Sequence, residues 1–106
     1  MIMAKQGDLK IWSIPQVPMK AFIVPVKTLA EAKLLLDTLA EYDLFQFHNR
    51  IKPDYSNAGG LSVFDEKDTT DSPLGSWITW YSDAGEEINH YTLEQLRSDP
   101  PKWENA

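Results

Sequence analysis

Hydrophobic and polar residues near the start of the chain follow the two-residue period of β-strands. They alternate from Leu9 to Ile14, and the segment 21–26 is a more continuous apolar run. Alternation places successive side chains on opposite faces of a strand. Pro25 lies inside the second run and has no N–H to donate to a ladder. The pattern predicts two strands, the second at a sheet edge or a bulge.

The pattern then changes to the period of an α-helix over residues 28–42. Thr28 and Glu31 have the spacing of a capping box, in which each side chain bonds the other residue's free backbone N–H. Charged residues of alternating sign lie on the opposite, solvent-facing side. The apolar stripe consists of Leu29, Ala32, Leu35, Leu36 and Leu39. The sequence therefore predicts an amphipathic helix that ends around Tyr42 to Leu44.

The second half of the chain has shorter patterns. Gly59-Gly60 predicts a turn before a short strand at 61–64, and the polar segment 65–75 predicts a mobile hairpin loop. A strand is expected at 76–82, where Trp77, Thr79 and Tyr81 share one face and Ile78 and Trp80 share the other. Residues 86–91 could return as a short strand after the turn at 83–85.

A second short helix is predicted near the end of the chain. Thr92 and Gln95 again have capping-box spacing, and Pro100 and Pro101 end the helix. The order of elements predicts an α+β fold: a mostly antiparallel sheet with the main helix on one face and a short C-terminal helix. At 106 residues the chain fits one domain, with about seven N-terminal and six C-terminal residues frayed.

Composition narrows the class of protein. There is no cysteine, which excludes disulfides and thiolate zinc sites. The first residues lack the apolar core of a signal peptide, and no apolar run reaches the roughly 20 residues of a membrane span. We therefore expect a cytoplasmic protein that does not enter the membrane.

Charge is divided unevenly along the chain. Residues 1–52 carry seven basic and five acidic side chains, for +2; residues 53–106 carry three and eleven, for −8; together these give the net charge of −6. An acidic surface repels phosphates, so direct binding of nucleic acid is not expected. The acidic half is interpreted either as a solubilising surface or as one that mimics nucleic acid and binds a basic groove on a partner.

No catalytic or metal-binding pattern emerges. His48 and His90 stand in no metal-binding spacing, and the loop from Asp65 fails the calcium template, which needs acidic or amide residues at alternate positions and a glycine at position 6. No nucleophile or phosphate-binding motif is present. We expect a protein that is not an enzyme and that has no metal and no cofactor.

Two features could form a binding site. In a sheet with one covered face, either Trp77 with Tyr81 or Ile78 with Trp80 lies on the open face, unless the C-terminal helix covers it. The segment 42–64 is long and rich in aromatics, and such a segment serves either as a rigid connector packed on the core or as a site.

Three segments resemble a family of small proteins carried by phages and prophages. They are DLFQFHNRIKPDYSNAGGLSVF at 43–64, WITWYSDAGEEI at 77–88 and IWSIPQVPMK at 11–20. Members share the core I-K-P-D-Y-x-N-A-G-G-L, and some are labelled superinfection exclusion, the blocking of a second phage. The resemblance implies a phage protein and brings no catalytic residue with it.

Together these observations predict an acidic protein that binds a host or competing-phage protein, one with a basic surface, in superinfection exclusion or in interference with host defence. The candidate contact residues are Tyr55, Asn57, Asp65, Glu66, Asp68, Asp71, Trp80 and Tyr81. The alternative is a small-ligand protein that holds a nucleotide-like molecule between Tyr55, Asn57 and Trp80.

Overall fold

The computed structural model describes residues 3–15, 20–49 and 58–104. Its elements in chain order are β1 (Leu9–Ile14), β2 (Phe22–Val26), α1 (Leu29–His48), β3 (Ala58–Asp65), β4 (Ser76–Thr79), a 3₁₀ turn (Ile88–His90) and α2 (Leu93–Ser98). The prediction of an α+β fold with a main helix and a short C-terminal helix is confirmed.

The four strands form one antiparallel sheet in the order β2-β1-β3-β4. β2 is an edge strand, as its internal proline predicts, and Pro25 stands opposite Lys10 of β1. β1 lies between β2 and β3 and pairs along its length with both. The alternation of β1 therefore sets which residues of its neighbours share each face of the sheet.

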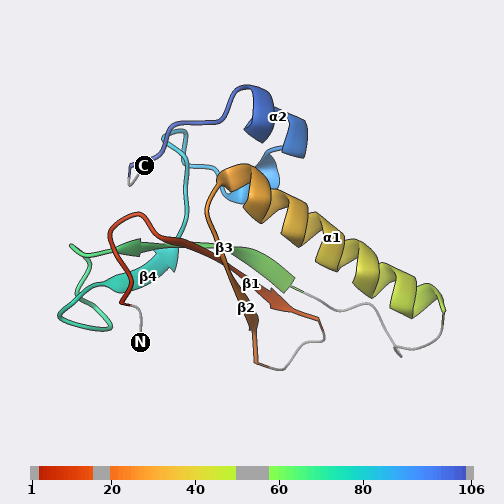
Figure 1. The fold of residues 1–106 in the computed structure, drawn as a ribbon, viewed down its shortest axis with the longest axis horizontal. Coiled ribbons are helices and arrows are strands. Elements are labelled where there is room, and N and C mark those ends of the chain that lie inside the picture. The colour runs from red at the N-terminus through yellow and green to blue at the C-terminus, as the bar shows by residue number, and fades with distance from the viewer. Residues whose placement is uncertain (1–2, 16–19, 50–57, 105–106) are drawn as a thin grey trace.

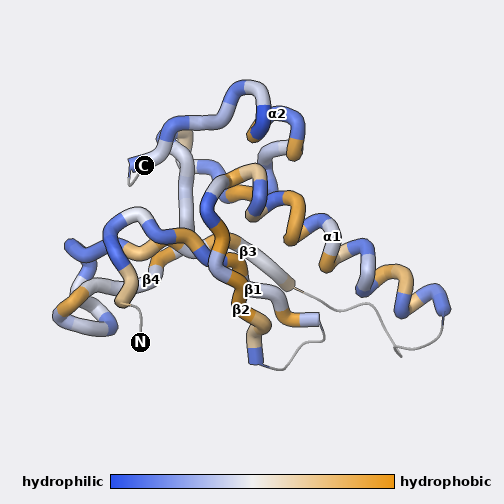
Figure 2. The backbone as a smooth tube through the Cα atoms, in the orientation of Figure 1, coloured by the Kyte–Doolittle hydropathy of each residue, from blue (hydrophilic) through white to orange (hydrophobic). Residues whose placement is uncertain are grey.

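Both helices lie on the same side of the sheet (Figure 1). Leu9 and Ile11 of β1 face them, together with Leu61 and Val63 opposite on β3. Figure 2 shows the hydrophobic colour in these central strands and at intervals along α1. The buried core consists of Leu9, Ile11, Val26, Leu29, Ala32, Leu36, Leu61, Val63, Trp80, Ile88 and Leu96. Burial of this apolar surface is the main favourable term in folding.

Helix α1 begins as predicted and ends later. The Thr28 hydroxyl accepts a hydrogen bond from the Glu31 N–H at 3.0 Å. The Glu31 carboxylate accepts from the Lys27 N–H at 2.9 Å, so the cap reaches one residue farther back than the predicted capping box. The helix continues to His48 and Asn49 caps it, whereas the sequence predicted an end near Tyr42 to Leu44. The aromatic residues beyond Tyr42 fit helical geometry and extend it without a stop signal.

The predicted turn at Gly59-Gly60 is wrong. Both glycines lie inside β3, opposite Ser13 and Trp12 of β1. A Cβ added to Gly60 would lie 2.9 Å from the Trp12 Nε1 atom. Gly60 is therefore needed because the Trp12 indole lies against the backbone of β3, which is the close-approach role of glycine in a strand.

The suggested strand at 86–91 is also wrong, and β4 is shorter than predicted. Ser82 N–H bonds to the Glu86 carbonyl and reverses the chain, and the 3₁₀ turn then buries Ile88. The Tyr91 hydroxyl lies 2.6 Å from the Ser82 hydroxyl oxygen and joins the two arms by side chains. Packing of Ile88 into the core thus replaces a ladder of backbone bonds. The predicted capping box of α2 is confirmed, since both the Thr92 and Gln95 bonds are present.

Truncation of the buried stripe of α1 tests this architecture. Leu36, 8% exposed, should lose about 2–5 kcal/mol of unfolding free energy on Leu36→Ala, because the change leaves a cavity. Leu34 lies on the same helix and is 45% exposed, so Leu34→Ala should stay within about 0.5 kcal/mol of the parent. Urea unfolding of both variants gives the comparison. Equal midpoints would contradict the assignment of the core face.

Candidate protein-binding surface

The sheet face opposite the helices carries partly exposed aromatic side chains. We call this surface the open face and define it by Lys10, Trp12, Ile23 and Trp77, which alternate with core residues along their strands. The Lys10 ammonium lies 4.0 Å from the centroid of the Trp77 ring, in a cation–π contact. Burial lowers the pKa of the Lys10 ammonium from its ordinary value. The open face is thus a polar-edged aromatic surface, of the composition found at protein interfaces.

Trp77 is held by a contact with its neighbour on β3. Its ring meets the Phe64 ring edge to face, with 5.3 Å between centroids. Phe64 itself is buried, and a side chain on Gly75 would collide with its ring at 2.6 Å. Gly75 also has a φ of +134°, a backbone conformation open to glycine and strained for other residues. The chain entering β4 is therefore shaped to leave room for Phe64, which packs beside Trp77 on the same face of the sheet.

The acidic loop, residues 65–75, connects β3 to β4 next to the open face. Its own side chains organise it: the Asp65 carboxylate accepts from the Lys67 N–H and the Asp68 carboxylate accepts from the Thr70 N–H, each at 3.0 Å. Such local side-chain bonds are typical of Asx turns. The predicted hairpin loop is confirmed, and it has an internal hydrogen-bond pattern.

The acidic loop is also joined to the N-terminal segment. The Glu66 N–H donates to the Gln6 side-chain oxygen at 2.7 Å, and the Gln6 N–H donates to the Glu66 carboxylate at 3.2 Å. The Gly7 N–H bonds to the Phe64 carbonyl at 3.0 Å. These bonds fix the start of the loop relative to β1, although no sequence pattern indicates a contact between residues 60 positions apart.

The structure brings together part of the predicted site. Asp65, Glu66, Asp68 and Asp71 share the acidic loop, and Tyr81, 53% exposed, lies beyond the opposite end of β4. The acidic loop leads into Ser76, the first residue of β4, and Tyr81 is five residues farther along the chain. In extended chain this separation is roughly 17 Å, at about 3.3 Å per residue. Tyr55 and Asn57 lie outside the described residues.

Trp80 is not a surface residue. It is 1% exposed, and its ring packs edge to face against Tyr91 and Trp103. Trp80 lies on the same face as Ile78, which is the face that the helices cover. The expectation that Trp80 is an exposed contact residue is therefore wrong. Trp77 occupies the open face instead. The alternation of residues 77 to 81 already separated these two tryptophans, but it could not say which face the helices cover.

Two further properties concern the described part of the chain. Across residues 3–15, 20–49 and 58–104, no three His, Cys, Asp or Glu side chains gather in an arrangement that could hold a metal ion. Neither described helix has the length and apolar character needed to span a bilayer.

A titration tests the internal order of the acidic loop. The Thr70 hydroxyl and backbone N–H bond the charged form of Asp68 and lower its pKa below 3.8. The stabilisation from these bonds is complete above pH 3.8 and is lost as the pH falls through the lower, folded-state pKa. Thr70→Val removes the hydroxyl and should raise the Asp68 pKa in an NMR titration of the carboxyl carbons. Thr69→Val should leave it unchanged, and an equal Asp68 pKa in all three proteins would contradict this geometry.

Comparison with known proteins places the chain in a family. The protein is 52% identical over 81 residues to a protein of Salmonella phage P22 named "Superinfection exclusion protein", a match that covers 72% of this chain and 79% of the phage P22 protein. No solved structure matches. Residues 8–98 match the family described as "Superinfection exclusion gene product 17". This range includes the whole sheet and both helices, and the chain belongs to this phage-encoded family.

Proposed function

We propose that this protein acts in superinfection exclusion by binding a protein of the host or of the competing phage. The observation that carries the proposal is the 52% identity to the phage P22 protein named for that phenotype. The matched range contains every strand of the open face and the whole acidic loop. The contact surface we propose therefore lies within the family's shared region.

The acidic loop and the open face are suited to act as one interface. Asp65 directly follows Phe64, and Phe64 stands opposite Trp77 in the β3–β4 ladder. An aromatic centre beside a charged margin is the usual anatomy of a protein interface. The charges are negative, so the partner we propose presents a basic surface, which would be steered toward the loop.

The small-ligand alternative finds less support at Trp80. The cavity that Trp80 helps to line has a volume of about 90 Å³. Sites for drug-sized ligands usually measure about 300–1,000 Å³. A nucleotide-like molecule does not fit beside Trp80 in this arrangement, and the roles assigned to Tyr55 and Asn57 remain predictions.

A plating assay tests the role of the acidic loop. Asp65→Asn, Glu66→Gln, Asp68→Asn and Asp71→Asn together remove four charges, and the amide oxygens can still accept the bonds within the loop. We expect cells that express the parent to exclude a superinfecting phage, and cells that express the loop variant to exclude it at least about tenfold less.

A matched variant controls for net charge. Glu87, Glu94, Asp99 and Glu104 are exposed and lie outside the acidic loop, and their amide variants change the net charge equally, from −6 to −2. This variant should exclude phage as the parent does. An equal loss of phage exclusion in both variants would assign the effect to net charge and contradict a specific role of the loop. A parent protein that does not exclude the phage would overturn the proposed function.

Binding kinetics separate the loop from the aromatic anchors. With a partner captured from infected cells and purified, neutralising the loop should slow association, and this difference should shrink as salt screens charges beyond about 8–10 Å. Trp77→Ala and Tyr81→Ala should instead speed dissociation, by about fivefold or more for a residue worth over 1 kcal/mol. Surface plasmon resonance measures both rates. Equal salt dependence of parent and loop variant would contradict a charge-steered interface.

A further inference from the structure

A second concave surface lies on the helix side of the sheet, away from the open face. It is a cleft of about 840 Å³ between the start of α1, the end of α2 and the segment Pro100 to Trp103, which we call the C-terminal strap. This volume is within the usual range of ligand sites, about 300–1,000 Å³. Family residues 8–98 supply its base, whereas the strap lies beyond the matched range.

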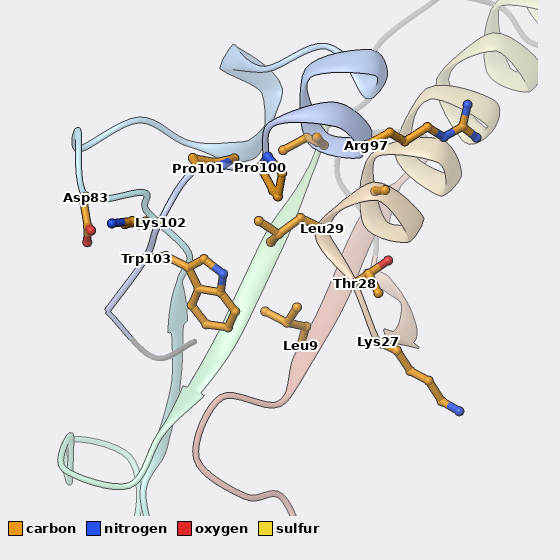
Figure 3. Close-up of a pocket in the computed structure, with 12 residues that line it drawn as sticks. Leu9, Lys27, Thr28, Leu29, Asp83, Arg97, Pro100, Pro101, Lys102 and Trp103 are labelled. Atoms are coloured by element: carbon orange, nitrogen blue, oxygen red, sulfur yellow. The ribbon is translucent and has the colours of Figure 1, made fainter.

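The interior of the cleft is apolar. Leu9 and Leu29 are almost fully buried, and Leu96 is 3% exposed at its base. In Figure 3 the side chains of Leu9, Leu29 and Trp103 point toward one another, with Pro100 and Pro101 above them. A ligand entering here would meet hydrocarbon and an indole ring, so its inserted part must itself be apolar.

The strap is held in place from two sides. The Asp83 N–H donates to the Lys102 carbonyl at 2.8 Å. The Trp103 ring packs edge to face on the buried Trp80 ring, with 6.2 Å between centroids. The wall of the cleft is therefore part of the fold, attached to the same aromatic cluster that fills the core.

The margin of the cleft is basic, in a protein whose net charge is −6. Lys27, Arg97 and Lys102 line it, and all three are exposed. None of the three makes an ion pair with a carboxylate among the described residues. One acid, Asp83, also lines the margin, on the side of Lys102 (Figure 3).

We propose that this cleft binds an anionic amphiphile, a molecule with a carboxylate, phosphate or sulfonate head on an apolar body. The apolar body would lie on Leu9, Leu29 and Trp103. The head would lie at the margin, where Lys27, Arg97 and Lys102 extend outward at separate points around the cleft (Figure 3). This site is separate from the proposed interface and does not depend on it, because the two surfaces lie on opposite faces of the sheet.

Binding of defined probes tests the cleft. Anilinonaphthalene sulfonate and dodecanoate should bind the purified protein, and dodecylamine should bind at least about tenfold more weakly because its head is repelled by the margin. Lys27→Gln, Arg97→Gln and Lys102→Gln together should weaken both anions by about tenfold, a ratio equivalent to about 1.4 kcal/mol. Fluorescence titration of anilinonaphthalene sulfonate and calorimetry of dodecanoate give the constants.

A control triple variant keeps the charge equal. Lys5, Lys20 and Lys67 are exposed and do not line the cleft, and their glutamine variants also bring the net charge to −9. This control should bind both probes as the parent does. NMR shifts on dodecanoate binding should concentrate at Leu29, Leu96 and the Trp103 indole. Equal weakening in both triple variants, or equal binding of dodecylamine and dodecanoate, would overturn the proposal.

A further arm of the experiment distinguishes two sources of the amphiphile, a membrane lipid and a free fatty acid. Flotation with phosphatidylglycerol vesicles, compared with phosphatidylcholine vesicles, asks whether a lipid in a bilayer supplies the head. Margin-dependent binding to the anionic vesicles supports a membrane lipid, and binding to dodecanoate alone supports a free fatty acid. Failure of both, in variants whose thermal unfolding matches the parent, overturns the site.

Discussion

β1 pairs with a strand on each of its sides, and this pairing determines which face every side chain of the sheet occupies. Leu9, Ile11 and Ser13 face the helices, and each register partner in β2 and β3 must face the same way. A slip of one residue would exchange the core face for the open face throughout the sheet. It would move Trp12 into the core and Ile11 into solvent. The apolar side chains that α1 and α2 cover therefore specify which aromatics remain accessible.

That same alternation explains how much of the fold could be predicted from the sequence. The strand at 9–14, the edge position of β2, the start of α1 and the capping box of α2 all follow from local patterns. Predictions from local patterns were wrong where a residue distant in the sequence determines the secondary structure. Gly59-Gly60 has the composition of a turn. In the structure the Trp12 indole of the neighbouring strand packs against Gly60, where a Cβ would collide with it. The 86–91 segment has strand-like composition, and burial of Ile88 makes it a 3₁₀ turn instead.

The candidate interface was predictable to a similar extent. The loop acids were found because charge patterning is visible in sequence, and the structure places them together. Trp80 was wrongly predicted to be an exposed contact residue, because the sequence pattern does not show which face of β4 the helix α1 covers. Trp80 and Trp77 are three residues apart, yet one is buried beneath the helices and the other packs against Lys10 on the opposite face. The bonds between Gln6 and Glu66, which hold the loop, carry no signature at all in the sequence.

The sheet also separates two regions of opposite charge on this small protein. The acidic loop extends from the β3–β4 end, and the basic margin of the cleft surrounds the start of α1 and the C-terminal strap. A Debye length of about 8 Å at physiological salt is short compared with the molecule's extents of 45 × 33 × 24 Å. The two regions therefore act as local potentials, and the net charge of −6 describes neither. A basic partner and an anionic amphiphile could occupy the protein together, because each would respond to the charges in its own neighbourhood.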